Sequence, residues 1–91
     1  MASKQSPFCT RNLTLTGGWD AFTVPNECNA LLIQARTSVD VSMSTRVNGV
    51  EPFTIKADKG VVVGSFNADN QILYFQGAGG VVVELITIDR P

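Results

Sequence analysis

The feature that most constrains the fold of this chain is a series of short β-branched and aromatic runs separated by turn residues. From residue 53 onwards, such runs alternate with clusters of Gly, Asp and Asn at a spacing of roughly ten residues. No segment shows the periodicity of an amphipathic helix. The pattern therefore predicts an all-β domain built from short strands.

Alternation of apolar and polar residues marks several runs as half-buried strands. In segment 39–43, Val39, Val41 and Met43 share one face, which we expect to point inward. Phe53 is expected to point inward from the next strand. The predicted strands are 11–16, 21–24, 29–36, 39–43, 52–57, 61–66, 71–76 and 81–88.

Turn signals separate these strands. Asn48-Gly49 predicts a hairpin, because a type I′ turn needs positive φ at both central residues. Segment 77–80 is Gly-rich, but it lacks the Lys-Ser/Thr of a phosphate-binding loop, so we interpret it as a hairpin turn. Segment 67–70 offers oxygen ligands for calcium, yet it is short and carries one formal charge. A plain Asx turn is the favoured interpretation there.

Seven or eight short strands leave two architectures, a β-sandwich or a small barrel. We favour a small antiparallel β-sandwich of jelly-roll-like type, with residues 9–91 as a single domain and residues 1–8 as an extended N-terminal arm. The runs 31–33, 61–63 and 81–83 are apolar on both faces and so need cover on both sides. Another subunit would supply the second cover. The alternative is that these apolar side chains are simply tolerated at the surface.

Composition points away from several partner classes. Hydrophobic residues make up 44% of the chain and charged residues 16%, compared with about 25% in a typical soluble protein. The net charge is −1 and the basic residues are scattered, which argues against nucleic-acid binding. We see neither a signal peptide nor an apolar run of about 20 residues, so we expect synthesis in a cytoplasm and no membrane partner.

The residues needed for familiar catalytic and metal sites are scarce. The chain has no histidine, which excludes Ser-His-Asp and Cys-His arrangements. Cys9 and Cys28 alone cannot complete a four-ligand zinc site. We expect both thiols to be reduced, although a disulfide between them is conceivable. The acidic residues lie mostly at turns or outward strand positions. We therefore expect no enzymatic activity, no cofactor and no metal.

Segment 71–77 is similar to the site cut by a viral cysteine protease that is used to remove purification tags. Leu73, Tyr74, Phe75, Gln76 and Gly77 match that site. Because the segment lies between two β-rich segments with turns on both sides, we interpret it as an ordinary strand. If it is well ordered, the protease should cut it poorly.

Trp19 lies in a Gly-flanked loop and has two interpretations. Its indole can close one end of the core, which we favour because large aromatic side chains are heavily buried on average. An exposed indole could instead stack on a sugar ring or enter a partner's pocket.

The segment FTIKADKGVVVGSFNADNQILYFQGAGGVVVELITI resembles a pattern of small bacteriophage virion proteins. The shared elements are an aromatic-Thr-aliphatic-Lys-Ala strand, a short Gly turn, an aliphatic strand, an "ilYf" strand, a Gly-rich turn and a final "vvvEli" strand. The preceding NALLIQARTSVDVSMS is similar to that family's upstream strand pair, so the resemblance covers residues 29–88. It implies a non-enzymatic structural protein of the particle, such as a capsid decoration (cement) protein or a head-fibre base.

Such proteins commonly form trimers on the capsid exterior and clamp neighbouring major capsid subunits, so the resemblance implies a homotrimer, the major capsid protein as partner and a virion location. Two other functions stay open: a tail or head–tail connector component, and a carbohydrate-binding module with exposed coplanar aromatic residues. The residues that we expect at an interface are Pro7, Phe8, Trp19, Leu32, Val62, Tyr74, Val82 and Ile86.

Overall fold

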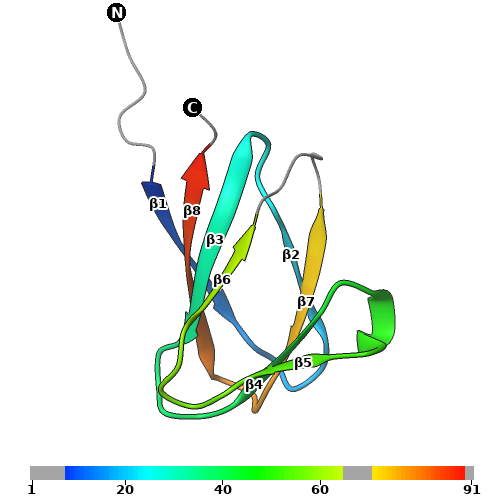
Figure 1. The fold of residues 1–91 in the computed structure, drawn as a ribbon. Helices are drawn as coiled ribbons and strands as arrows, with labels where there is room; N and C mark the ends of the chain where they lie inside the picture. The colour runs from blue at the N-terminus through cyan, green and yellow to red at the C-terminus, as the bar shows by residue number, and fades with distance from the viewer. Residues whose placement is uncertain (1–7, 65–70, 90–91) are drawn as a thin grey trace, which may run out of the picture.

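The computed structural model describes residues 8–64 and 71–89 (Figure 1). Within this part of the chain the regular structure is β-strand, with one short 3-10 turn and no α-helix. Each of the eight predicted segments overlaps one observed strand. The elements are β1 (Phe8–Thr14), β2 (Asp20–Thr23), β3 (Cys28–Ala35), β4 (Val41–Ser44), η1 (Val47–Gly49), β5 (Phe53–Ile55), β6 (Val61–Gly64), β7 (Ile72–Gln76) and β8 (Val82–Asp89).

The strands form two four-stranded antiparallel sheets that face each other (Figure 1). One sheet has the order β1-β8-β3-β6 and the other has the order β2-β7-β4-β5. The first strand therefore pairs with the last, the second with the seventh, the third with the sixth and the fourth with the fifth. This is the order produced when one long antiparallel ribbon folds over on itself, and it is the strand order of a jelly roll. The predicted jelly-roll-like sandwich is confirmed, and the barrel alternative is wrong.

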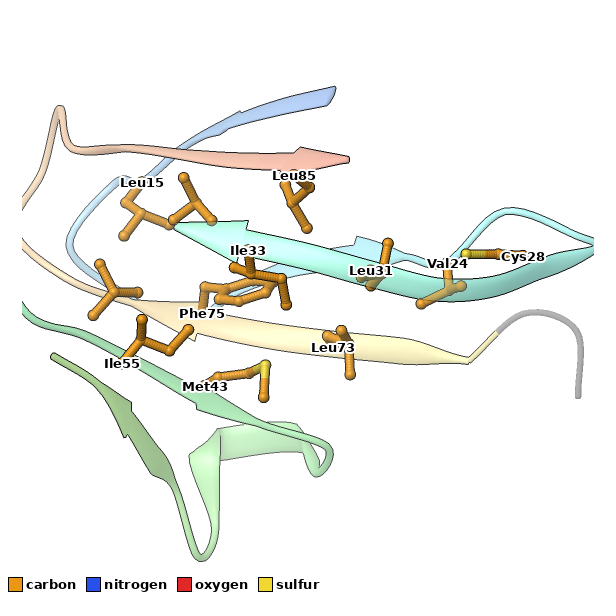
Figure 2. Close-up of a cluster of buried hydrophobic side chains, with 12 residues drawn as sticks. Leu15, Val24, Cys28, Leu31, Ile33, Met43, Ile55, Leu73, Phe75 and Leu85 are labelled. Atoms are coloured by element: carbon orange, nitrogen blue, oxygen red, sulfur yellow. The ribbon is translucent and has the colours of Figure 1, made fainter. Parts of the chain in front are cut away.

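The hydrophobic core lies between the two sheets (Figure 2). Alternate residues of each interior strand point into it, as the sequence pattern predicts: Leu31 and Ile33 are buried, whereas Leu32 between them is exposed. The buried hydrophobic residues are Leu15, Val24, Cys28, Leu31, Ile33, Val41, Met43, Ile55, Leu73, Phe75, Val83 and Leu85.

The segment that resembles a protease site is an ordinary interior strand. Its residues 72–76 form β7, which pairs with β2 on one side and with β4 on the other. Leu73 and Phe75 from this strand are among the most deeply buried side chains. Because β7 contributes to the centre of the core, it belongs to the fold of the domain.

The structure corrects several details at strand ends. Phe8, which we had assigned to the arm, is the first residue of β1 and pairs with Ile88; residues 1–7 and the turn at 67–70 lie outside the described residues. Val39 precedes β4 and is half-buried. Phe53 was expected to point inward, but it is 54% exposed. It lies at one end of a three-residue edge strand, where the facing sheet covers Ile55 but not Phe53.

The Asn48-Gly49 signal is confirmed in its dihedral angles. Both residues have positive φ, 65° and 67°, and β4 pairs with β5 as a hairpin. The connection is longer than a two-residue turn, because residues 45–52 join the strands and include η1. A Cβ at position 49 would overlap the Trp19 indole, so Gly49 is required both for its dihedral angles and for its small size.

A matched pair of phenylalanine substitutions tests the placement of the core. Phe75→Ala removes a fully buried ring and should lower the free energy of unfolding by about 3–5 kcal/mol. Phe53→Ala removes a largely exposed ring and should cost less than about 1 kcal/mol. Urea denaturation at one fixed protein concentration measures both values. Equal losses would contradict the described core.

Candidate interaction surface

The sheet β1-β8-β3-β6 (Figure 1) has an outward side, here called the outer face, that carries a row of aliphatic residues on β8, β3 and β6. Strand register places Thr10 beside Ile86, Ile86 beside Leu32, and Leu32 beside Val62. Leu32 on the interior strand β3 is 38% exposed, and Val62 on the edge strand β6 is 71% exposed. The row therefore presents aliphatic side chains to solvent.

A second apolar row lies next to the first, at the end of the sheet where β1 begins. It consists of Phe8, Ile88, Ala30 and Gly64, which are brought into line by the same pairings. The Phe8 side chain is 55% exposed, and Ile88 and Ala30 are half-buried. The two rows together make the apolar part of the outer face.

A polar row borders the apolar part on its other side. Asn12, Glu84 and Gln34 lie side by side on β1, β8 and β3. The Glu84 carboxylate accepts hydrogen bonds from Arg36 Nε at 2.8 Å and from Gln34 Nε2 at 3.0 Å. In the amide orientation that satisfies its hydrogen bonds, Asn12 accepts from Arg36 Nη2 at 3.2 Å and donates to the Arg11 carbonyl at 3.1 Å. Each of these polar groups is thus held by its neighbours.

This network lowers the pKa of Glu84. The main cause is the hydrogen bond from the Arg36 guanidinium, followed by the hydrogen bond from the Gln34 amide, because both stabilise the ionised carboxylate. The Arg36–Glu84 pair is half-exposed and carries no net charge. The outer face therefore combines an apolar surface with a hydrogen-bonded polar border in which the Arg36–Glu84 pair is neutral.

The outer face contains a hollow of about 470 Å³ that is open to solvent. Its apolar walls come from Leu32, Val62 and Ile86, and its polar end from Gln34 and Glu84. Among the described residues, no aromatic side chain lines it. A sugar-binding platform depends on stacking against aromatic rings, so this hollow is better suited to aliphatic side chains of a protein partner.

The structure brings together five of the eight residues that we expected at an interface. Phe8, Leu32, Val62, Val82 and Ile86 all lie on the outer face, as their registers show. Pro7 lies outside the described residues. Tyr74 and Trp19 lie elsewhere.

Tyr74 is half-buried on β7 of the other sheet, beside Ala21 and Ser44. The Ser44 side chain is buried there, and its hydroxyl donates to the Val50 carbonyl at 2.7 Å, which anchors the 45–52 connection to the sheet. This sheet therefore has local cover from the 45–52 connection, and residues 8–64 and 71–89 provide no comparable cover for the outer face.

Trp19 neither closes the core nor stands free in solvent. It is half-buried, is absent from the hydrophobic core cluster, and packs its indole against Gly49 of η1. The favoured prediction, that the indole closes one end of the core, is wrong. The longer connection between β4 and β5, which the sequence pattern does not reveal, supplies the surface on which the indole packs.

Acidic side chains in the described residues mostly have structural partners. Asp20 accepts from the Thr16 backbone N–H and hydroxyl, Asp40 accepts from Ala57 N–H, and Asp58 accepts from the Ser38 hydroxyl. No group of three or more His, Cys, Asp or Glu side chains is placed to hold a metal ion in residues 8–64 and 71–89. The calcium candidates at 67–70 fall outside these ranges.

Cys9 and Cys28 are both free thiols, so the disulfide alternative is not realised. Cys9 is exposed on β1, whereas Cys28 is buried on β3, and its thiol donates to the Ala30 carbonyl at 3.2 Å.

The polar row was missed by the sequence analysis. Gln34 and Arg36 are separated from Glu84 by 50 and 48 positions, so no local spacing signals their contact. Only the register between β3 and β8 brings them together.

Replacing Glu84 tests the polar row through its pH dependence. A carboxyl whose pKa is lower in the folded state stabilises that state above its unfolded pKa, and this contribution is lost as the pH falls through the folded pKa. We therefore expect Glu84→Gln to reduce the loss of thermal stability seen as the pH falls below about 4.5. Melting temperatures from neutral to acidic pH measure this loss.

The control for that experiment is Glu51→Gln. It removes a carboxylate of an exposed pair, whose oxygen lies 3.2 Å from Arg46, and leaves the polar row intact. Glu51→Gln should keep the acid dependence of the original protein. If the melting temperatures of Glu84→Gln and of the original protein fall by the same amount as the pH is lowered, the network does not stabilise the ionised carboxylate.

In the described residues, no helix is long and apolar enough to cross a membrane.

Comparisons with known proteins identify no relative of this chain. No protein-family model matches the chain, and no curated protein and no solved structure is significantly similar to it.

Proposed function

We propose that this chain is a non-enzymatic structural protein of a bacteriophage particle that self-associates through its outer face and stabilises the capsid shell. The phage context rests on the resemblance of residues 29–88 to small virion proteins. The need for a protein partner rests on the surface of the sandwich. These two supports are independent of each other.

The observation that carries the proposal is that the sandwich has a complete core and still exposes apolar residues on its outer face. Leu31 and Ile33 already fill the interior from β3, so Leu32 on the same strand has no role in that core. Each Å² of apolar surface removed from water contributes about 25 cal/mol, so covering this face would stabilise an assembly. Contiguous exposed apolar surface rimmed by polar residues is a common mark of interaction sites.

The partners that fit this surface are other chains of the particle. With 16% charged residues, the molecule has little charge with which to repel neighbours in a crowded shell. We propose a homotrimer on the capsid exterior, assembled after synthesis in the host cytoplasm, with the major capsid protein as second partner. No cofactor or catalytic residue is part of this proposal.

The alternative functions receive less support. A carbohydrate-binding module depends on coplanar aromatic rings, and the hollow on the outer face is lined by aliphatic and polar side chains. A tail or connector component would use the same apolar face but would assemble into a larger ring. The number of subunits distinguishes this possibility from a decoration protein.

Substituting Leu32 tests self-association. In Leu32→Lys the long stem can follow the sheet while the ammonium stays in water, so the monomer should fold. Burying that charge against a second chain costs several kcal/mol, which should lower the association constant by at least about a hundredfold. Sedimentation velocity should find a trimer for the original protein and a monomer for Leu32→Lys.

The matched control is Thr54→Lys, which adds the same charge to an exposed strand position of the other sheet. It should remain trimeric. A monomeric original protein at high concentration would contradict self-association, and a hexamer or dodecamer would favour the connector alternative.

Particles assembled with and without this chain test the role in the shell. Particles without it should release their contents at a lower temperature, because they lack the contacts that bridge neighbouring capsid subunits. Adding back the original protein should restore the release temperature, whereas adding Leu32→Lys should not. Identical release temperatures with and without the chain would argue against a cementing role.

A further inference from the structure

The sheet that carries the outer face ends in two strands, β1 and β6, at opposite edges (Figure 1). Edge strands expose backbone groups that can pair with another chain, and proteins commonly protect them with proline or charge. The edges of the other sheet have such protection: β2 begins with Asp20, and β5 lies between Pro52 and Lys56. In the sheet of the outer face, β1 follows Pro7 in the sequence and contains one charged residue, Arg11, whereas β6 contains neither proline nor charge.

β1 presents a long and regular edge. It pairs with β8 over seven residues without a bulge, and the Leu15 N–H continues the ladder by donating to the Val81 carbonyl at 2.8 Å. Backbone groups of successive strand residues point to opposite sides. The odd-numbered residues therefore face β8, and Thr10 and Asn12 direct their backbone N–H and C=O groups toward the open edge.

The same reasoning applies to β6. The Arg36 N–H donates to the Val82 carbonyl, so even-numbered residues of β3 face β8 and odd-numbered residues face β6. Leu31 and Ile33 pair with Val63 and Val61, which leaves the backbone of Val62 directed toward the open edge. This residue is also the most exposed large hydrophobic residue in the described chain.

The two edges are compatible in direction and in face. Two strands, β8 and β3, separate them in an antiparallel sheet, so β1 and β6 run in opposite directions, and a head-to-tail neighbour brings them together as an antiparallel pair. At both edges, the residues whose backbone faces outward carry their side chains on the outer face: Thr10 on β1 and Val62 on β6. Pairing these edges therefore continues the outer face from one copy into the next.

We propose, resting on the self-association proposed above, that copies of this chain join by pairing β6 of one copy with β1 of the next. The occupant of each edge is thus a second copy of the chain. Symmetric β1–β1 pairing is less favourable, because it joins two strands that both carry a positive charge at Arg11 and leaves Val62 uncovered. Pairing β6 with β1 covers Val62 and places no like charges in contact, since β6 has none.

A head-to-tail contact has a consequence for assembly. Each copy binds one neighbour through β6 and another neighbour through β1, so the same contact repeats until the ring closes. The proposed trimer would then be a closed ring of three sheets joined edge to edge, with the outer faces turned toward the inside of the ring, where Leu32 is covered. A symmetric contact would stop at two copies.

Cross-linking between variants that each have one exposed cysteine tests the pairing. In a Cys9→Ser background, Thr10→Cys marks β1 and Val62→Cys marks β6, while the buried Cys28 stays protected. A short bismaleimide cross-linker tolerates a shift of register. Neither variant alone should cross-link. In an equal mixture, half of the copies carry each cysteine, so about one contact in four should have Cys at position 62 of one copy and at position 10 of the next, and should cross-link. Thr54→Cys, on the other sheet, should not cross-link with either variant.

The double variant Thr10→Cys/Val62→Cys adds a second readout, since every contact can then be linked. The largest cross-linked species should contain the same number of subunits as the oligomer found by sedimentation. Cross-linking of either variant alone, or an oligomer without any link between positions 10 and 62, would overturn this pairing while leaving self-association intact. A monomer in sedimentation would overturn both.

Discussion

The structure depends most on the pairing of β8 with two strands from the other end of the chain. β8 lies between β1 and β3 and holds the sheet together through a continuous register with β1. Its inward residues Val83, Leu85 and Thr87 are buried, and the Thr87 hydroxyl donates to the Cys9 carbonyl at 3.3 Å. Its outward residues Glu84 and Ile86 carry the polar and apolar rows. One strand therefore fixes both the core and the outer face.

The outward sides of the two sheets differ in how much the rest of the described chain covers them. On the sheet that contains β7, the 45–52 connection is anchored by Ser44 and receives the Trp19 indole against Gly49. The outer face has no comparable cover within the described residues, although it carries Leu32 and Val62. This asymmetry is the physical basis for proposing a structural protein that is completed by its neighbours. The edge strands β1 and β6 of the same sheet would give this self-association a defined direction.

The strand positions and most of the inward residues could be predicted, because alternation is a local property of a pleated strand. Leu31, Ile33, Val41 and Met43 are buried as their spacing predicts. Phe53 was misplaced because its pattern cannot tell whether the facing sheet extends over the end of an edge strand. Trp19 was misplaced because its contact depends on a connection whose path is not encoded in a repeating pattern.

The sequence by itself determined the fold class, the approximate strands, and the expectation that aliphatic residues lie on both faces of β3 and β8. Which of these residues meet was decided only by the tertiary structure. The pairing of β8 with β3 brings Glu84 to Gln34 and Arg36, about 50 residues apart in the chain, and gathers Phe8, Leu32, Val62 and Ile86 on one surface. Alternation within a strand is a short-range effect of backbone geometry, whereas register between distant strands follows from packing of the whole core.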